Sequence, residues 1–203
     1  MIRALLTISI ASILAHAEPS SSAIFIITSE SLTVPLQTVV DSTRSGDTLQ
    51  LRGHYRLHNL TLTRPITIIG LDSASLEADS AGDIIHIKET SGVTISGLTL
   101  KNAPVSFLHE FAAINLTKAS DCRILENTFV DNFFGIYLSD SKQILIERNN
   151  LTGADRSMSH AGNGIHLWNS REVTINHNRV VGHRDGIYFE YARQIDVQHN
   201  RSE

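Results

Sequence analysis

The chain has 203 residues, of which 41% are hydrophobic and 19% are charged, and its formal net charge at pH 7 is −4. This composition is ordinary for one soluble globular domain, and the length requires no second domain. No basic stripe is present to neutralise phosphates, which excludes nucleic acid as a partner.

Residues 1–17 have the three parts of a secretory signal peptide. Arg3 supplies a basic start, Ala4–Leu14 form an apolar run of 11 residues, and Ala15–Ala17 place small residues at the cleavage positions. An apolar run of this length is too short to cross a bilayer as an anchor. We therefore expect the signal peptide to be removed and the mature, exported chain to begin at Glu18.

Residues 18–44 form an N-terminal segment that leads into a repeat occupying residues 45–203. Within this repeat the stretch Gly164–Leu167 returns as Gly186–Phe189, 22 residues later. Apolar and polar residues alternate over three to five positions, which is the period of a β-strand, and no window is a convincing amphipathic helix. The pattern predicts an all-β, right-handed parallel β-helix with coils of about 22 residues that stack about 4.8 Å apart.

One column of the repeat contains asparagine, with successive steps of 22, 29 and 22 residues: Asn127, Asn149, Asn178 and Asn200. Stacked asparagines recur in cross-β packing, so we expect an internal ladder that bonds neighbouring coils and closes a turn. Cys122 falls in a column of inward apolar residues, which predicts a core position and not a nucleophile. No capping element follows the last asparagine, and the C-terminal coil is expected to be uncapped.

Longer corners account for the 29-residue step, and they lie on one edge of the predicted solenoid. Residues 103–112 and 154–163 form long corners, which alternate with the short corners at residues 132–134 and 183–185. Insertions stacked on one edge commonly build a binding face, so we expect this loop edge to dock a partner protein. The side chains expected to make the contact are Phe107, Phe111, Phe133, Phe134, Arg156 and Arg184.

The same loop edge also carries histidine and methionine. Imidazole and thioether are soft ligands that suit copper, although their spacing matches no compact metal motif. The candidate copper ligands are His109, Met158, His160 and His183. Copper binding, protein docking and plain packing are therefore alternative hypotheses for the loop edge, and the sequence requires no cofactor.

A second candidate surface is the strand face that follows the glycine corners. Tyr137, His166 and Tyr188 are expected to point outward in one column, with Trp168 and Glu190 in the next. Rings can stack on sugars while carboxylates bind hydroxyls, so the face could bind carbohydrate; alternatively the rings pack against one another across coils. Hydrolysis would need two carboxylates that converge on one bond, and no repeated acidic cluster supplies them. We therefore expect no enzymatic activity.

Several segments resemble the NosD family in colinear order from Gly46 to Glu203. They read GDTLQLRGHYRLHNLTLTRPITIIG, GVTISGLTL, GIYLSDSKQILIERNNLTG, GNGIHLWNS and RDGIYFEYA, and the last two are the most specific. NosD proteins are periplasmic and accompany an ABC transporter in the maturation of nitrous oxide reductase. The resemblance carries over no catalytic residues.

The resemblance implies a non-enzymatic periplasmic accessory protein for assembly of the copper–sulfur centre of nitrous oxide reductase. Its implied partners are the membrane and ATP-binding subunits of the transporter, together with the copper enzyme or a copper chaperone. The alternative is a carbohydrate-binding or carbohydrate-cleaving β-helix that uses the strand face. Neighbouring genes for a copper enzyme and an ATPase would distinguish the two hypotheses.

Overall fold

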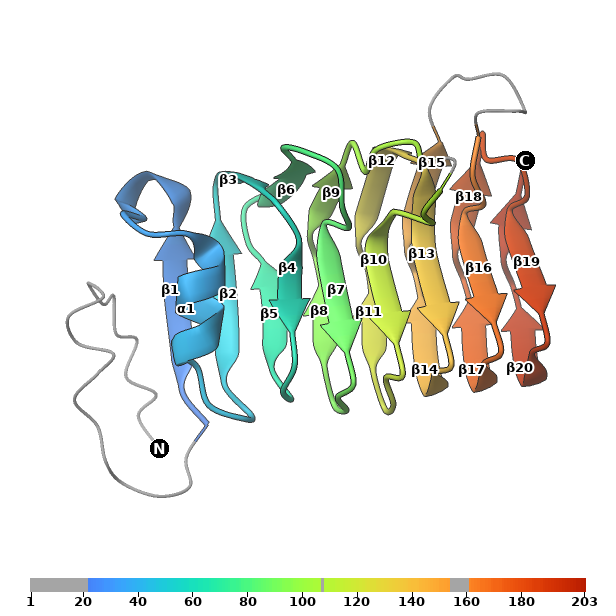
Figure 1. Ribbon diagram of the computed structural model, residues 1–203, viewed down its shortest axis with the longest axis horizontal. Helices are drawn as coiled ribbons and strands as arrows, with labels where there is room; N and C mark the ends of the chain where they lie inside the picture. The colour runs from blue at the N-terminus through green and yellow to red at the C-terminus, as the bar shows by residue number, and fades with distance from the viewer. Residues whose placement is uncertain (1–21, 107, 154–160) are drawn as a thin grey trace.

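The computed structural model describes residues 22–106, 108–153 and 161–203, which wind into a stack of coils with three parallel sheets (Figure 1). The 8-stranded sheet A contains, in spatial order, β1 (Ile24–Thr28), β2 (Thr48–Arg52), β5 (Thr67–Gly70), β8 (Thr94–Ser96), β11 (Arg123–Leu125), β14 (Lys142–Glu147), β17 (Arg171–Asn176) and β20 (Arg193–Gln198).

The other two sheets complete each coil. The 7-stranded sheet B contains β3 (His54–Leu57), β6 (Ser75–Ala78), β9 (Thr99–Lys101), β12 (Thr128–Asn132), β15 (Asn150–Gly153), β18 (Arg179–Val181) and β21 (Arg201–Ser202). The 6-stranded sheet C contains β4 (Leu60–Leu62), β7 (Ile85–Lys88), β10 (Ala112–Thr117), β13 (Phe134–Ser139), β16 (Ile165–Trp168) and β19 (Ile187–Glu190).

The strands pair in parallel at the spacing of the sequence repeat. In sheet C, Ile136 pairs with Ile165, which in turn pairs with Ile187. The first two side chains are fully buried inside the solenoid, where burial of each apolar side chain is worth about 1.5–3 kcal/mol. The all-β right-handed parallel β-helix predicted from the sequence is confirmed.

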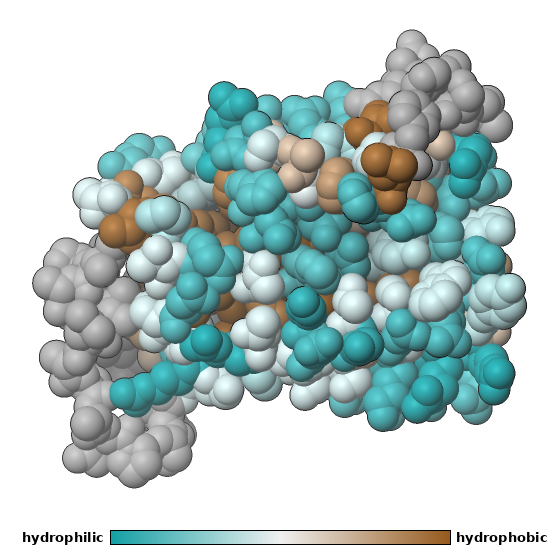
Figure 2. Space-filling view, viewed as in Figure 1, coloured by the Kyte–Doolittle hydropathy of each residue, from teal (hydrophilic) through white to brown (hydrophobic). Residues whose placement is uncertain are grey.

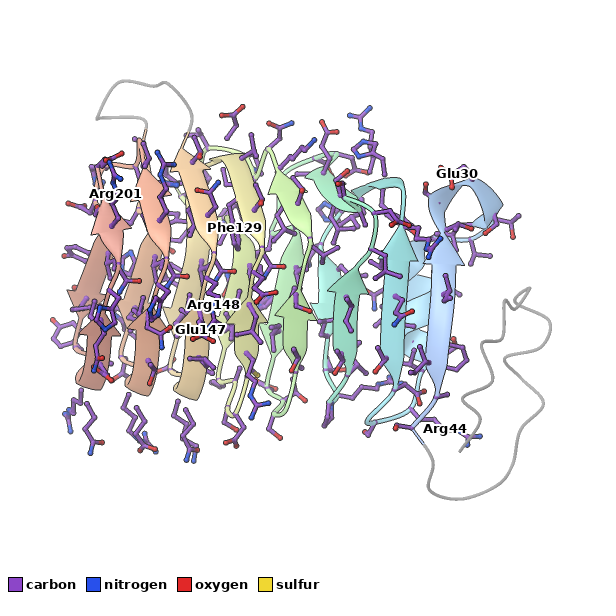
Figure 3. The ribbon with its side chains drawn as sticks, turned by 180° about the vertical axis from the view of Figure 1, so that it is seen from behind. Glu30, Arg44, Phe129, Glu147, Arg148 and Arg201 are labelled. Atoms are coloured by element: carbon purple, nitrogen blue, oxygen red, sulfur yellow. The ribbon has the colours of Figure 1, made fainter. Side chains whose placement is uncertain are left out.

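The interior is apolar and the outer surface carries the charges. Phe129 of β12 is fully buried (Figure 3), as is Cys122, where burial raises the pKa of the thiol to about 11. Glu147 and Arg148, by contrast, form an ion pair of 3.0 Å on the outside of the stack. The core position expected for Cys122 is confirmed.

The predicted asparagine ladder is present at one corner of the coils, and all its members except Asn200 are buried. Asn127 donates its backbone N–H and its Nδ2–H to Oδ1 of Asn149, at 3.0 and 3.1 Å. Asn149 makes the same two bonds to Asn178, at 2.9 and 3.0 Å, and Asn178 makes them to Asn200. Each side chain thereby satisfies polar groups of the turn before it, which would otherwise be buried without partners.

A second polar ladder, which the sequence analysis did not identify, runs along the corner between sheets C and A. Ala119 donates its N–H to Oγ of Ser141 at 3.0 Å, and Ser141 donates its N–H to Oγ of Ser170 at 3.1 Å. Both serines are buried. Short hydroxyl side chains therefore serve this corner in the way that asparagines serve the other.

The N-terminal segment leads into the solenoid through β1, which pairs with β2 in sheet A, and through helix α1 (Leu36–Ser42), which follows the 3-10 helix η2 (Ser29–Ser31). The expectation that the chain has no amphipathic helix is therefore wrong. Leu36, Val39 and Val40 of α1 are buried against the first coil.

Gln37 of α1 satisfies the open edge of sheet C at β4. Its side-chain amide accepts the N–H of Thr61 at 2.8 Å and donates to the C=O of Thr61 at 3.1 Å. The amide thus takes the place of a neighbouring strand, which is one way of protecting a sheet edge.

At the other end of the stack, no described residue covers the last coil. Phe189 and Val197 occupy inward positions of that coil and are 44% and 43% exposed, whereas the equivalent Leu167 and Ile175 of the previous coil are fully buried. Within the described residues, no helix combines the length and the apolarity needed to cross a membrane.

Candidate functional site

The loop edge is built from corners that enter sheet C, and the structure describes only part of it. Four of its candidate residues lie outside the described residues: Phe107, Arg156, Met158 and His160. The described candidates are Phe111 and His109 in the first long corner, Phe133 and Phe134 in the short corner, and His183 and Arg184 in the last corner.

Two of the phenylalanines differ in what they can offer a partner. Phe134 is 6% exposed, and its ring packs edge-on against Phe133, with the centroids 4.8 Å apart. It also lies 5.7 Å from the ring of Tyr137, so its main role is packing. Phe133 is partly exposed, and Leu108, which the sequence analysis did not single out, is 87% exposed. Figure 2 shows apolar surface at the upper right of the molecule, on the side of the loop edge.

The expected outward column on sheet C is present as a packed ladder of rings. Tyr137, His166 and Tyr188 pair in register on successive strands. The ring centroids of His166 lie 4.9 Å from those of both tyrosines. At this spacing the rings stabilise one another across the coils, which is the packing role considered for them from the sequence.

A chain of hydrogen bonds fixes the protonation state of His166. Arg184 donates from Nη2 to Oδ1 of Asn163 at 3.1 Å, and a guanidinium can only donate. The amide of Asn163 must therefore present Nδ2 to Nδ1 of His166, 3.1 Å away, so the imidazole proton resides on Nε2. Burial lowers the pKa of His166, and among the described residues its Nε2 has no hydrogen-bond partner.

Two other imidazoles of the candidate copper set have different surroundings. Burial lowers the pKa of His183 to about 4, and its Nε2 has no partner among the described residues. His109 instead lies against Phe111, with ring centroids 5.3 Å apart. In the described part of the chain, no three His, Cys, Asp or Glu side chains gather as a metal site. The copper hypothesis therefore depends on residues outside that part.

The last ring of the ladder and a ring in the neighbouring column are accessible to solvent. Trp168 and Glu190 pair in register in the neighbouring outward column, and Trp168 and Tyr188 are 36% and 39% exposed. The pKa of Tyr137 is raised to about 12 by burial and then by the negative charges of Glu110, Glu190 and Asp140. The face is thus aromatic and acidic, a combination that suits sugar hydroxyls better than an anion.

Glu110 was missed because it belongs to a long corner, and only the fold brings that corner beside sheet C. The pair Asp83 and His86 on the same face was likewise not predicted from the sequence. Their carboxylate and Nδ1 lie 3.6 Å apart, and burial raises the pKa of Asp83 and lowers that of His86. Asp83 and His86 are three residues apart in the sequence, as are Asn163 and His166. This shared spacing was the one feature of the sequence that could have indicated the pair.

The comparisons with known proteins agree with this architecture. The model of the family described as Right handed beta helix region matches residues 21–202. The chain is 27% identical over 130 residues to the "Probable ABC transporter binding protein NosD" of Pseudomonas aeruginosa, a match that covers 63% of this chain and 30% of that protein. The resemblance to NosD is thereby confirmed, as a partial one.

Two solved structures share the fold at low identity. A polygalacturonase from Erwinia carotovora ssp. carotovora superposes with a TM-score of 0.75 at 14% identity, covering 93% of this chain and 65% of that one. A putative glycosyl hydrolase from Parabacteroides merdae superposes with a TM-score of 0.68 at 15% identity, covering 82% of this chain and 88% of that one. At these identities the similarity is one of fold alone.

Proposed function

We propose that this chain, which belongs to the family of the right handed beta helix region, is a non-enzymatic accessory protein that works with an ABC transporter. The fold of this family hosts several functions, so the proposal is argued from the surfaces of the chain and from its relative. We place it in the periplasm, where it assists assembly of the copper–sulfur centre of nitrous oxide reductase. Copper enters this proposal as cargo and not as a resident cofactor.

The observation that carries the proposal is the partial similarity to a protein named as an ABC transporter binding protein. This chain spans 30% of the length of that relative, so the partners and the activity are proposed for it and not transferred.

The loop edge is the surface that we propose for the partner. Extra corner length adds no residues to the interior columns and costs ordering entropy, so its recurrence along one edge calls for another reason. Phe133 offers a partly exposed ring and Leu108 an exposed aliphatic side chain, and Arg184 supplies a directional donor. Apolar anchors combined with arginine are typical of protein interfaces.

Co-purification with the membrane and ATP-binding subunits of an ABC transporter, co-expressed with this chain, tests this proposal. The triple variant Leu108→Ser, Phe133→Ser and Arg184→Ala is expected to reduce recovery of the subunits at least about tenfold, because interface anchors typically contribute more than 1 kcal/mol each. Arg123→Ala, which removes an exposed arginine from sheet A, is the matched control and should change nothing. Full recovery with a folded triple variant would contradict the proposed surface.

Carbohydrate binding is a second candidate, favoured by the exposed Trp168 and Tyr188 beside Glu190. Titration of neutral and acidic oligosaccharides against the fluorescence of Trp168, the one tryptophan of the chain, tests it directly. Saturable quenching that is lost in Tyr188→Ala would favour this function over the accessory role. A flat titration would leave the accessory role as the better explanation.

A further inference from the structure

Sheet B has an open edge at its N-terminal end, which sheet C does not have. Among the described residues, strand β3 ends the sheet and pairs only with β6, because the described part of the N-terminal segment contributes a strand to sheet A but none to sheet B. Gly53 and Leu57 accept hydrogen bonds from the β6 side, at 2.9 and 3.1 Å. Backbone groups alternate along a strand, so those of His54 and Arg56 point the other way.

These outward-pointing backbone groups are only partly satisfied. The N–H of His54 donates to Oγ of Ser29 at 3.1 Å. For the N–H and C=O of Arg56, no partner is found in the described ranges. The neighbouring edge at β4 is closed by the amide of Gln37, so the two edges are treated differently.

A groove of about 510 Å³ lies along this open edge. Its walls include Leu32 and Val34 from the N-terminal segment and Leu57 from β3, all of which are partly buried apolar side chains that pack on the core. Figure 2 shows apolar surface at this N-terminal end of the molecule. The groove therefore combines an apolar floor with free strand backbone.

The charge in the groove is positive at the position of Arg56. Glu77, which pairs with Arg56 in the strand register, is already held by Nε2 of His54 at 3.0 Å and by Nδ2 of Asn102 at 3.0 Å. Asp79, at the end of the groove, accepts the hydroxyl of Ser80 at 2.6 Å. Arg56 is exposed and forms no ion pair with any carboxylate of the described chain.

We propose that this groove binds an extended segment of a partner polypeptide, which adds to sheet B as a strand beside β3. A strand added there alternates its side chains in the same way as β3 does. Two inward side chains would pack on Leu32, Val34 and Leu57, and the outward side chain between them would lie beside Arg56. The recognised sequence is therefore an apolar–acidic–apolar triplet. This site is separate from the loop edge and does not depend on the function proposed above.

The test uses the full chain and a fluorescent peptide, acetyl-Ser-Val-Glu-Val-Ser-amide, with a twin in which Lys replaces Glu. Fluorescence anisotropy is expected to show that the unaltered protein binds the Glu peptide about tenfold more tightly than the Lys peptide. Arg56→Glu should reverse this preference, and Arg123→Glu, an exposed arginine of β11, is the matched control that should keep it. Replacing the second Val of the peptide by N-methyl-valine should abolish binding, because the strand hydrogen bond is lost.

Hydrogen exchange distinguishes strand addition from a purely electrostatic contact with Arg56. Amide exchange in His54–Leu57 is expected to slow when the Glu peptide binds, while exchange in the other strands stays the same. The proposal is overturned if the Glu peptide does not bind, if N-methylation has no effect, or if Arg56→Glu leaves the preference unchanged. It is also overturned if sedimentation shows that the protein alone dimerises and that Arg56→Glu dissociates the dimer, because the occupant is then a second copy.

Discussion

At the scale of the residue, the protonation states of the imidazoles beside sheet C depend on the neighbouring side chains and not on the position of each histidine in the repeat. His166 is held as a neutral ring by Asn163, whose own orientation is dictated by Arg184. The Nε2 atom of His183, on the next coil, is buried and has no hydrogen-bond partner among the described residues. Neutral imidazoles of this kind make the folded state sensitive to acid.

The pH dependence of stability is predicted from His183. Burial lowers its pKa from 6.5 to about 4, so the unfolded chain binds more protons between these values. Stability should therefore be fully present above pH 6.5 and fall as the pH falls toward 4, by at most about 1.4 kcal/mol per pH unit from this residue. Urea titrations at several pH values measure the slope.

Two variants separate this contribution from that of other groups. His183→Gln should flatten part of the slope, whereas His177→Gln, at an exposed position, should leave it as it is. An identical slope in the His183→Gln protein would contradict the assignment.

Asn178 provides the residue-scale test of the ladder. Replacing it by Ala leaves the N–H of Asn149 buried without its partner, which costs about 1–3 kcal/mol, and removes the side-chain hydrogen bond to the C=O of Ile146. The free energy of unfolding should fall by about 2–5 kcal/mol in chemical denaturation. Asn150→Ala, an exposed neighbour on β15, is the control, and an equal loss in both variants would argue against a special role for the ladder.

At the scale of the element, what could be predicted from the sequence depended on how often a feature recurs. The strands and the asparagine column recur in every one of the later coils, so each coil supports the interpretation of the next. Helix α1 has seven residues, and its apolar stripe of Leu36, Val39 and Val40 is too short to stand out as a helical period. The serine ladder was missed because its two members, Ser141 and Ser170, are too few to form a visible column.

The candidate site was less predictable than the fold for a related reason. The register of sheet C foretold that Tyr137, His166 and Tyr188 would share one column. The register could not predict that the negative charge of Glu110 would raise the pKa of Tyr137. Glu110 lies in a corner, and a corner follows no period because its path is set by tertiary packing. The same limit applies to Asn163 and Arg184, whose contact joins two corners.

The cap made by α1 gives the element-scale prediction. Gln37→Ala removes the amide that satisfies the N–H and C=O of Thr61, and it should lower the free energy of unfolding by about 1–3 kcal/mol. Thr38→Ala, an exposed neighbour on the same helix, is the matched control. Thermal or urea unfolding followed by circular dichroism measures both. Equal stability of Gln37→Ala and the parent protein would show that water replaces the amide at no cost.

At the scale of the whole molecule, the coils share one continuous interior, so its opening can be followed at a single atom. Cys122 is the one cysteine of the chain, it is fully buried, and burial raises its thiol pKa to about 11. A thiol reagent should therefore leave the native protein unlabelled and should react as the stack unfolds. The labelling midpoint in urea is expected to coincide with the midpoint seen by circular dichroism. Rapid labelling in buffer alone would show that the stack opens locally at this coil.

The repeat interval of the asparagine ladder also bears on how such a chain changes over generations. The steps from Asn127 to Asn149 and from Asn149 to Asn178 are 22 and 29 residues, yet the hydrogen bonds at both steps join equivalent atoms at nearly the same lengths. Insertions and deletions at a corner therefore leave the strand register untouched, whereas a single-residue slip within a strand would turn its side chains inside out. Selection can lengthen, shorten or exchange corners almost freely while the coils stay constant. Lineages of this protein should accordingly diverge in recognition much faster than in architecture.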